Sequence, residues 1–257
     1  MSDNQFEVSP PTSAAVPDRG PLTFVLIPSY LLGPETWHGV GEVLGRLGYE
    51  SVSTTTTTTT PRDPDHIGPW VDHVVDEVEK SAHSPLVLVA HSASCPRLPL
   101  VARRLIDRGH DVRALIAVNG RFPWVDGQSP IDADPPLRDL LDGMVRPNDY
   151  LPPWHRWWGS MILDMIPSDE VRKRIFSEAK AVPRALFDQG IEVPELPESV
   201  RWAFLATGKA YEPAYERAKE AGWQVARLDG EHLHIVVDPI TVAGALLSLI
   251  DRCDNCR

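Results

Sequence analysis

A serine directly follows a buried apolar run and directly precedes a segment with helical spacing. Residues 86–95 read LVLVAHSASC, so that a short β-rich stretch leads straight to Ser92. A tight strand-to-helix turn, the nucleophile elbow, exposes a serine hydroxyl above the edge of a sheet. Such a turn needs small residues two positions before and after the serine, and Ala90 and Ser94 are small. Ser92 is therefore a candidate nucleophile, and capping of the next helix is the alternative role of its hydroxyl.

A histidine that could serve as the base for this serine stands far along the chain. Residues 228–239 read LDGEHLHIVVDP, which indicates the end of a strand, a short loop carrying His232, and a helix that begins near Pro239. A loop at the carboxyl end of a strand lies on the same side of a parallel sheet as the elbow. His234 could pair with His232 on a metal, but no third ligand is apparent, so we expect no metal.

The loop after the first apolar strand could supply a hydrogen-bond donor to the same site. Residues 26–37 read LIPSYLLGPETW. A backbone N–H of this loop, together with the N–H of the residue after the nucleophile, can stabilise the negative oxygen of a tetrahedral intermediate. We assign these two oxyanion donors to Tyr30 and Ala93.

Apolar runs and amphipathic stretches alternate along most of the chain, which predicts an α/β fold with a mostly parallel sheet and helices on both faces. Residues 51–60 contain seven consecutive threonines and are expected to be part strand and part loop. The other expected strands are 23–27, 86–90, 114–118, 202–206 and 223–228, and the expected helices cover parts of 37–47, 67–78, 98–105, 213–221 and 242–250.

The proline-rich stretch at 121–199 breaks this alternation and is expected to be a cap inserted into the core, with one helical piece near 168–180. Its aromatic cluster, Trp154, Trp157 and Trp158, would suit the wall of an apolar substrate pocket, although packing the cap onto the sheet is the alternative. The core would then comprise 21–120 and 200–252, with a disordered leader at 1–20 and a tail at 253–257.

The composition excludes several classes of partner. The 257 residues include 25 Lys and Arg against 36 Asp and Glu, a formal net charge of −11, which argues against nucleic acid and against an anionic membrane surface. No apolar run approaches the length of a membrane span, and residues 1–20 lack the features of a secretory signal. With only three cysteines, two of them in the C-terminal tail, we expect a cytoplasmic protein without disulfides. The oligomeric state stays open.

With these motifs in order, the chain from about 22 to 250 resembles the α/β-hydrolase superfamily. The resemblance is greatest to the small esterases, which include salicylate-ester and pyrethroid-type esterases and the related hydroxynitrile lyases. The first loop of that branch reads like PGAWLGGWVW where this chain has PSYLLGPETW, and its elbow reads like GHSxGG where this chain has AHSASC. The histidine of that branch lies seven residues before a proline, as His232 does here. The branch also has a DGQS segment, which in this chain begins at Asp126. It implies the α/β-hydrolase fold with an inserted cap and no cofactor; a dinucleotide is excluded separately, because residues 28–33 contain only one glycine.

One feature of the family is missing. Its triad acid belongs in the loop after the strand that precedes the histidine, where this chain has Gly208 or Tyr211. Neither residue is expected to hold the imidazole tautomer or to balance an imidazolium charge. The other location of the acid, after the strand ending at Val118, is Asn119, which we also place at the substrate pocket. Glu212 and Asp126 lie near these loops and are the candidate surrogate acids.

Three functions remain open at this point. In the first, a serine hydrolase uses Ser92 and His232 on a small apolar or aromatic ester, thioester or lactone. In the second, a lyase, cyclase or transferase uses the same pair without a strong acid. In the third, the pocket binds a small molecule and catalyses nothing.

Overall fold

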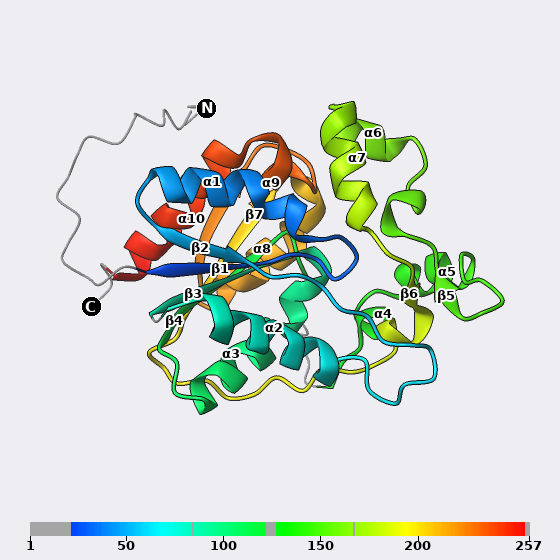
Figure 1. The fold of residues 1–257 in the computed structure, drawn as a ribbon, viewed down its shortest axis with the longest axis horizontal. Coiled ribbons are helices and arrows are strands. Elements are labelled where there is room, and N and C mark those ends of the chain that lie inside the picture. The colour runs from blue at the N-terminus through cyan, green and yellow to red at the C-terminus, as the bar shows by residue number, and fades with distance from the viewer. Residues whose placement is uncertain (1–21, 84, 122–126, 167, 255–257) are drawn as a thin grey trace.

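The computed structural model describes residues 22–83, 85–121, 127–166 and 168–254 (Figure 1). A six-stranded sheet in the order β2-β1-β3-β4-β7-β8 forms the centre, and every pairing in it is parallel. Its strands are β1 (Thr23–Ile27), β2 (Glu50–Ser53), β3 (Leu86–His91), β4 (Val112–Val118), β7 (Arg201–Thr207) and β8 (Gln224–Leu228). The five expected strands are confirmed, and β2 takes up only the start of the threonine-containing segment.

The strand order reverses between β1 and β3, because the chain moves outward to β2 and then returns to the other side of β1. Such a switch point opens a crevice at the carboxyl ends of the two strands, where ligands of open α/β sheets bind. Tyr30 follows β1 and Ser92 follows β3, so both sequence candidates lie at this crevice.

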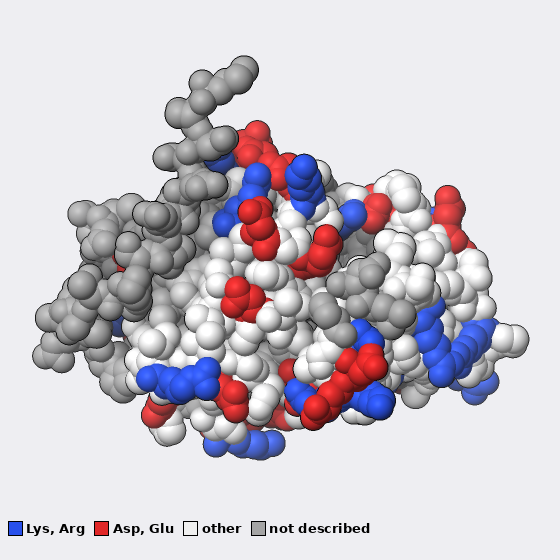
Figure 2. Space-filling view, turned by 90° about the horizontal axis from the view of Figure 1, so that it is seen from above, with Lys and Arg blue, Asp and Glu red and all other residues white. Residues whose placement is uncertain are grey.

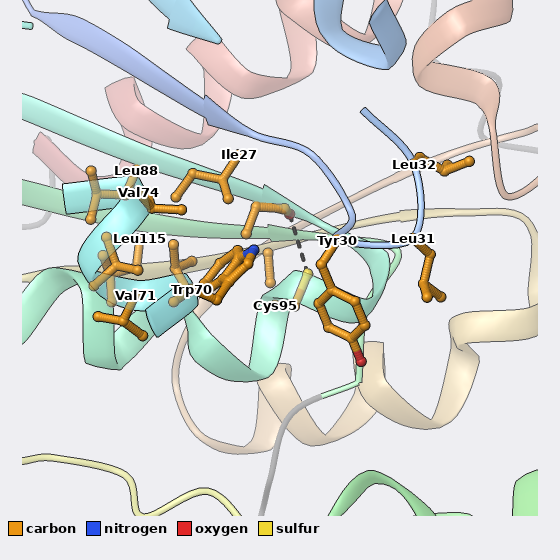
Figure 3. Close-up of a cluster of buried hydrophobic side chains, with 14 of the residues drawn as sticks. Ile27, Tyr30, Leu31, Leu32, Trp70, Val71, Val74, Leu88, Cys95 and Leu115 are labelled. Carbon is orange, nitrogen blue, oxygen red and sulfur yellow. Dashed lines mark hydrogen bonds between the residues drawn. The ribbon is translucent and has the colours of Figure 1, made fainter. Parts of the chain in front are cut away.

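Two apolar layers cover the sheet because successive side chains of a strand point to opposite faces. Phe24 and Leu26 of β1 pack with α1 and α10, whereas Val25 and Ile27 pack with α2 and α3. Figure 1 shows these helices on opposite sides of the strands, and Figure 3 shows Trp70, Val71 and Val74 of α2 in the second layer. The core helices are α1 (His38–Arg46), α2 (Gly68–Ser81), α3 (Leu98–Asp107), α8 (Glu212–Glu220), α9 (His234–Val237) and α10 (Pro239–Asp254).

The segment between β4 and β7 forms short elements at one end of the sheet (Figure 1). The helix expected near 168–180 is α7 (Asp169–Glu178), and its N-terminus is capped by the Ser168 hydroxyl. Further short elements of this segment are α4 (Pro130–Ala133), α5 (Pro135–Asp142), β5 (Tyr150–Leu151), α6 (Met161–Met165) and β6 (Val182–Pro183). Apart from the eight-residue α5, they are too short to show a sequence period. Strands β5 and β6 pair antiparallel as a separate two-stranded sheet.

Acidic and basic side chains are interspersed on the face shown in Figure 2. Within the described part of the chain, no helix has both the length and the hydropathy of a membrane-spanning segment. Helix α10 continues to Asp254, two residues beyond the expected end of the core. The expected leader at 1–20 and the candidate acid Asp126 lie outside the described residues.

Candidate active site

The turn at Ser92 has the backbone geometry of an elbow. Strand β3 ends at His91, and the 3-10 helix η2 (Ser92–Arg97) begins at the next residue. Ser92 has φ 56°, which is in the left-handed region that residues with a side chain rarely occupy. Residues with such strained backbone angles cluster at functional sites. Gly120, just after β4, lies close against this turn: a Cβ there would come within 2.7 Å of the Ser92 carbonyl oxygen and closer still to Cys95 Sγ.

His232 lies beside this serine. Its Nε2 is 3.1 Å from Ser92 Oγ, although 140 residues separate the two in the chain. The loop between β8 and α9 carries it, and two side chains bind the His232 carbonyl oxygen. Asn119 Nδ2 donates to the His232 carbonyl oxygen at 3.0 Å, and His91 Nε2 lies 3.1 Å from the same oxygen.

Asn119 acts on backbone groups rather than on the imidazole ring. It is fully buried, has φ 50°, and its Oδ1 accepts a hydrogen bond from the Thr207 N–H at 2.7 Å. Because its Nδ2 also donates to Thr207 Oγ1 and to the His232 carbonyl, the amide joins the ends of β4 and β7 to the histidine loop. A carboxylate could not make this pattern, since it lacks the N–H donors.

The far nitrogen of His232 meets a phenol. Tyr211, at the end of the 3-10 helix η5 (Lys209–Tyr211), places its hydroxyl 2.8 Å from His232 Nδ1. Tyr211 thus contacts the ring, although a phenol neither fixes the imidazole tautomer nor balances an imidazolium charge. Glu212, in contrast, points its carboxylate at Arg227 Nη2, 2.5 Å away, and is 41% exposed. Tyr211 is one of the two residues that the sequence resemblance placed at the position of the triad acid, and Glu212 was favoured over it because a phenol carries no charge at neutral pH.

The environment keeps the imidazole neutral. Burial lowers the pKa of His232 well below 6.5, and the adjacent His91 lowers it further. Burial also lowers the pKa of His91, to about 4. The pKa of Tyr211 is raised by burial, so its phenol stays protonated at neutral pH. A neutral phenol can donate to Nδ1 or accept from it, whereas a carboxylate can only accept, so Tyr211 permits both imidazole tautomers.

Tyr30 and Ala93, the expected oxyanion donors, both line the cavity beside Ser92. The Tyr30 N–H already has an acceptor, because it donates to Ser94 Oγ at 3.0 Å. The Ser94 hydroxyl in turn donates to the Pro28 carbonyl oxygen at 2.7 Å. The Ala93 N–H lies in the first turn of η2, where an N–H has no carbonyl of its own helix to bind.

A cavity of about 430 Å³ opens onto Ser92 and His232. The predicted pocket residues Trp154, Trp157 and Trp158 all line it, together with Asn119. The Trp154 ring is 5.6 Å from that of His232, centroid to centroid. Aromatic and aliphatic side chains dominate the wall, which suits an apolar or aromatic ligand with one polar reacting group.

Comparison with known proteins identifies the fold. No protein-family model and no curated protein sequence matches the chain. Among solved structures, an extracellular α/β-hydrolase from a Paenibacillus species, described as sharing structural and functional homology with tobacco salicylic acid binding protein 2, is 16% identical. Its TM-score is 0.67, and the match covers 89% of this chain and 99% of that one.

Two further structures are similar over a comparable span. A variant of a pyrethroid hydrolase has a TM-score of 0.65 and 16% identity, with 90% of this chain and 98% of that chain covered. A variant of tomato methylketone synthase I, complexed with β-ketoheptanoate, has a TM-score of 0.63 and 11% identity, with 91% and 99% covered. The chain therefore has the α/β-hydrolase fold, as its motifs predicted.

Proposed function

We propose that this protein is a cofactor-independent serine hydrolase that acts on a small apolar or aromatic ester, thioester or lactone. The observation that carries the proposal is the pair formed by Ser92 Oγ and His232 Nε2, 3.1 Å apart, at a strained elbow that opens onto an aromatic-lined cavity. A nucleophile and a base within hydrogen-bond reach, with the base held by a third group, form the constellation for covalent acyl transfer.

In the proposed reaction, Ser92 Oγ bonds to the carbonyl carbon while its proton passes to His232 Nε2. The carbonyl π electrons move onto oxygen; when they return, the bond to the leaving group breaks. The leaving oxygen or sulfur takes that bonding pair and the proton from His232. Water then repeats the sequence on the acyl-Ser92 ester, releasing the acid and regenerating the serine.

A fluorophosphonate probe tests the nucleophile directly. We expect one covalent label per chain, located on Ser92 by peptide mass spectrometry, and no label on a folded Ser92→Ala variant. A wild-type protein that stays unlabelled while its circular dichroism and melting temperature are normal would overturn the proposal.

One observation favours a second candidate, a non-hydrolytic lyase, cyclase or transferase. Among the described residues, His232 Nδ1 has the Tyr211 hydroxyl as its hydrogen-bond partner and no carboxylate that would stabilise a protonated His232. Reactions that need only brief or partial proton transfer demand less of such a base. Turnover in H₂¹⁸O separates the two candidates, because hydrolysis places ¹⁸O in the acid product and the non-hydrolytic reactions do not.

A further inference from the structure

The Ser94 hydroxyl links the elbow to the loop after β1. Ser94 lies two residues after Ser92 and is fully buried. A hydroxyl has one proton and two lone pairs, and the bond to the Pro28 carbonyl oxygen at 2.7 Å uses that proton. The Tyr30 N–H, 3.0 Å away, is then bound by a lone pair of the same oxygen. The hydroxyl is thus fixed by partners on both sides.

This bond occupies a donor that the proposed reaction would use. Tyr30 and Ala93 are the backbone groups placed to receive the oxyanion, and the Tyr30 N–H already donates to a side chain. A reacting carbonyl oxygen would have to compete with Ser94 Oγ for it. The loss of one oxyanion donor typically lowers kcat by roughly 10²- to 10³-fold. The elbow motif GHSxGG, which this chain resembles, has a glycine at the position of Ser94. A glycine there would leave the Tyr30 N–H free.

We propose that Ser94 is a positioning residue that withholds the Tyr30 N–H from the developing oxyanion and thereby restricts the enzyme to activated acyl groups, namely aryl esters and thioesters. This inference rests on the proposed hydrolase function. A phenolate or thiolate leaves more readily than an alkoxide, so its esters depend less on oxyanion stabilisation. Alkyl esters of the same acid, in contrast, need both donors.

The experiment compares two esters of one acid, p-nitrophenyl butyrate and ethyl butyrate, in the wild-type protein and in Ser94→Gly and Ser94→Ala. Both variants remove the hydroxyl, and alanine keeps the Cβ. We expect kcat/KM for ethyl butyrate to rise at least tenfold and that for p-nitrophenyl butyrate to rise much less. The preference for the aryl ester should therefore fall in both variants.

Ser29→Ala is the matched control. Ser29 is a buried serine of the same loop whose Oγ accepts from the Leu31 N–H at 3.3 Å and does not bind the Tyr30 N–H. The ratio of kcat/KM for p-nitrophenyl butyrate to that for ethyl butyrate should be the same in Ser29→Ala as in the wild type. Ser92→Ala combined with Ser94→Gly should abolish both activities, which shows that the gain arises at the elbow. Melting temperatures check that every variant is folded.

The possible failures are distinguishable. If the wild type is labelled by fluorophosphonate but the folded Ser94 variants keep the wild-type preference, the role of Ser94 is overturned and the hydrolase function stands. Lower ethyl butyrate activity in these variants also overturns it, because Ser94 would then itself be a donor to the oxyanion. If neither the wild type nor a variant is labelled or hydrolyses either ester, the hydrolase function fails, and the role of Ser94 fails with it.

Discussion

A phenol and a carboxylate have different effects on the imidazole that they contact. A carboxylate accepts from Nδ1–H, leaves Nε2 free to take the serine proton, and offsets the charge of the imidazolium. The Tyr211 hydroxyl, 2.8 Å from His232 Nδ1, orients the ring but brings no charge. The ring is therefore held in place as a weak base, because its pKa is lowered.

We expect Tyr211→Phe to lower the rate of Ser92 acylation about three- to tenfold, because a hydrogen bond of this kind is worth about 1 kcal/mol net. Stopped-flow measurement of the p-nitrophenolate burst reports this step. Glu212→Gln tests the alternative surrogate: its carboxylate binds Arg227 at the surface, so the burst rate should not change. A large loss in Glu212→Gln with none in Tyr211→Phe would reverse this assignment.

At the scale of elements, the end of β4 lies directly against the elbow that follows β3. The contact is made by Gly120, where a Cβ would overlap Cys95 Sγ and approach the Ser92 carbonyl oxygen. Asn119 ties the same strand end to β7 and to the histidine loop. The strained φ of Ser92 is thus maintained by packing between neighbouring strand ends.

Gly120→Ala should lower the free energy of unfolding by about 1–3 kcal/mol, the usual cost of an overpacked buried site. Activity should fall further than stability alone explains, because the clash displaces the turn that carries Ser92. Gly45→Ala in α1 is the control, since a Cβ added there would meet no atom within 4 Å, and it should stabilise by up to about 1 kcal/mol. Urea unfolding and fluorophosphonate labelling rates measure both effects. Normal labelling in Gly120→Ala would contradict the proposed contact.

At the scale of the whole molecule, the lowered pKa values of His91 and His232 couple stability to pH. The pKa of His91 is about 4 in the folded chain and about 6.5 when unfolded, so between these values the unfolded state binds more protons. The free energy of unfolding is therefore highest above pH 6.5, where His91 is neutral in both states, and it decreases as the pH falls from 6.5 toward 4. The lowered pKa of His232 acts in the same direction.

We expect the free energy of unfolding to be on the order of 3 kcal/mol lower at pH 4 than at pH 7 from His91 alone. Urea titrations at pH 7, 5.5 and 4 measure it, and His91→Asn should flatten the dependence. Activity should persist below pH 6.5, because His232 accepts the serine proton only while neutral and its pKa lies below that value. An acid limb of kcat/KM at or above pH 6.5 would contradict a lowered pKa for His232.

Local patterns were enough to predict much of this protein. Apolar runs predicted five strands of the sheet, and the residues at their carboxyl ends predicted Ser92, His232 and Tyr30 at one edge. Such predictions succeed because strand ends in a parallel sheet converge whatever the intervening sequence is. The short elements between β4 and β7 were missed, since a four-residue helix or a two-residue strand shows no period.

The sequence by itself determined the α/β core, the elbow and the histidine loop, because each depends on neighbouring residues and on the order of strands. Only the tertiary structure decided which group meets His232 Nδ1 and whether the Tyr30 N–H is free. The Tyr211–His232 bond spans 21 residues and the Tyr30–Ser94 bond spans 64, across loops whose paths no local period encodes. Hydrogen bonds depend on tenths of an ångström and on direction, which only the packed chain specifies.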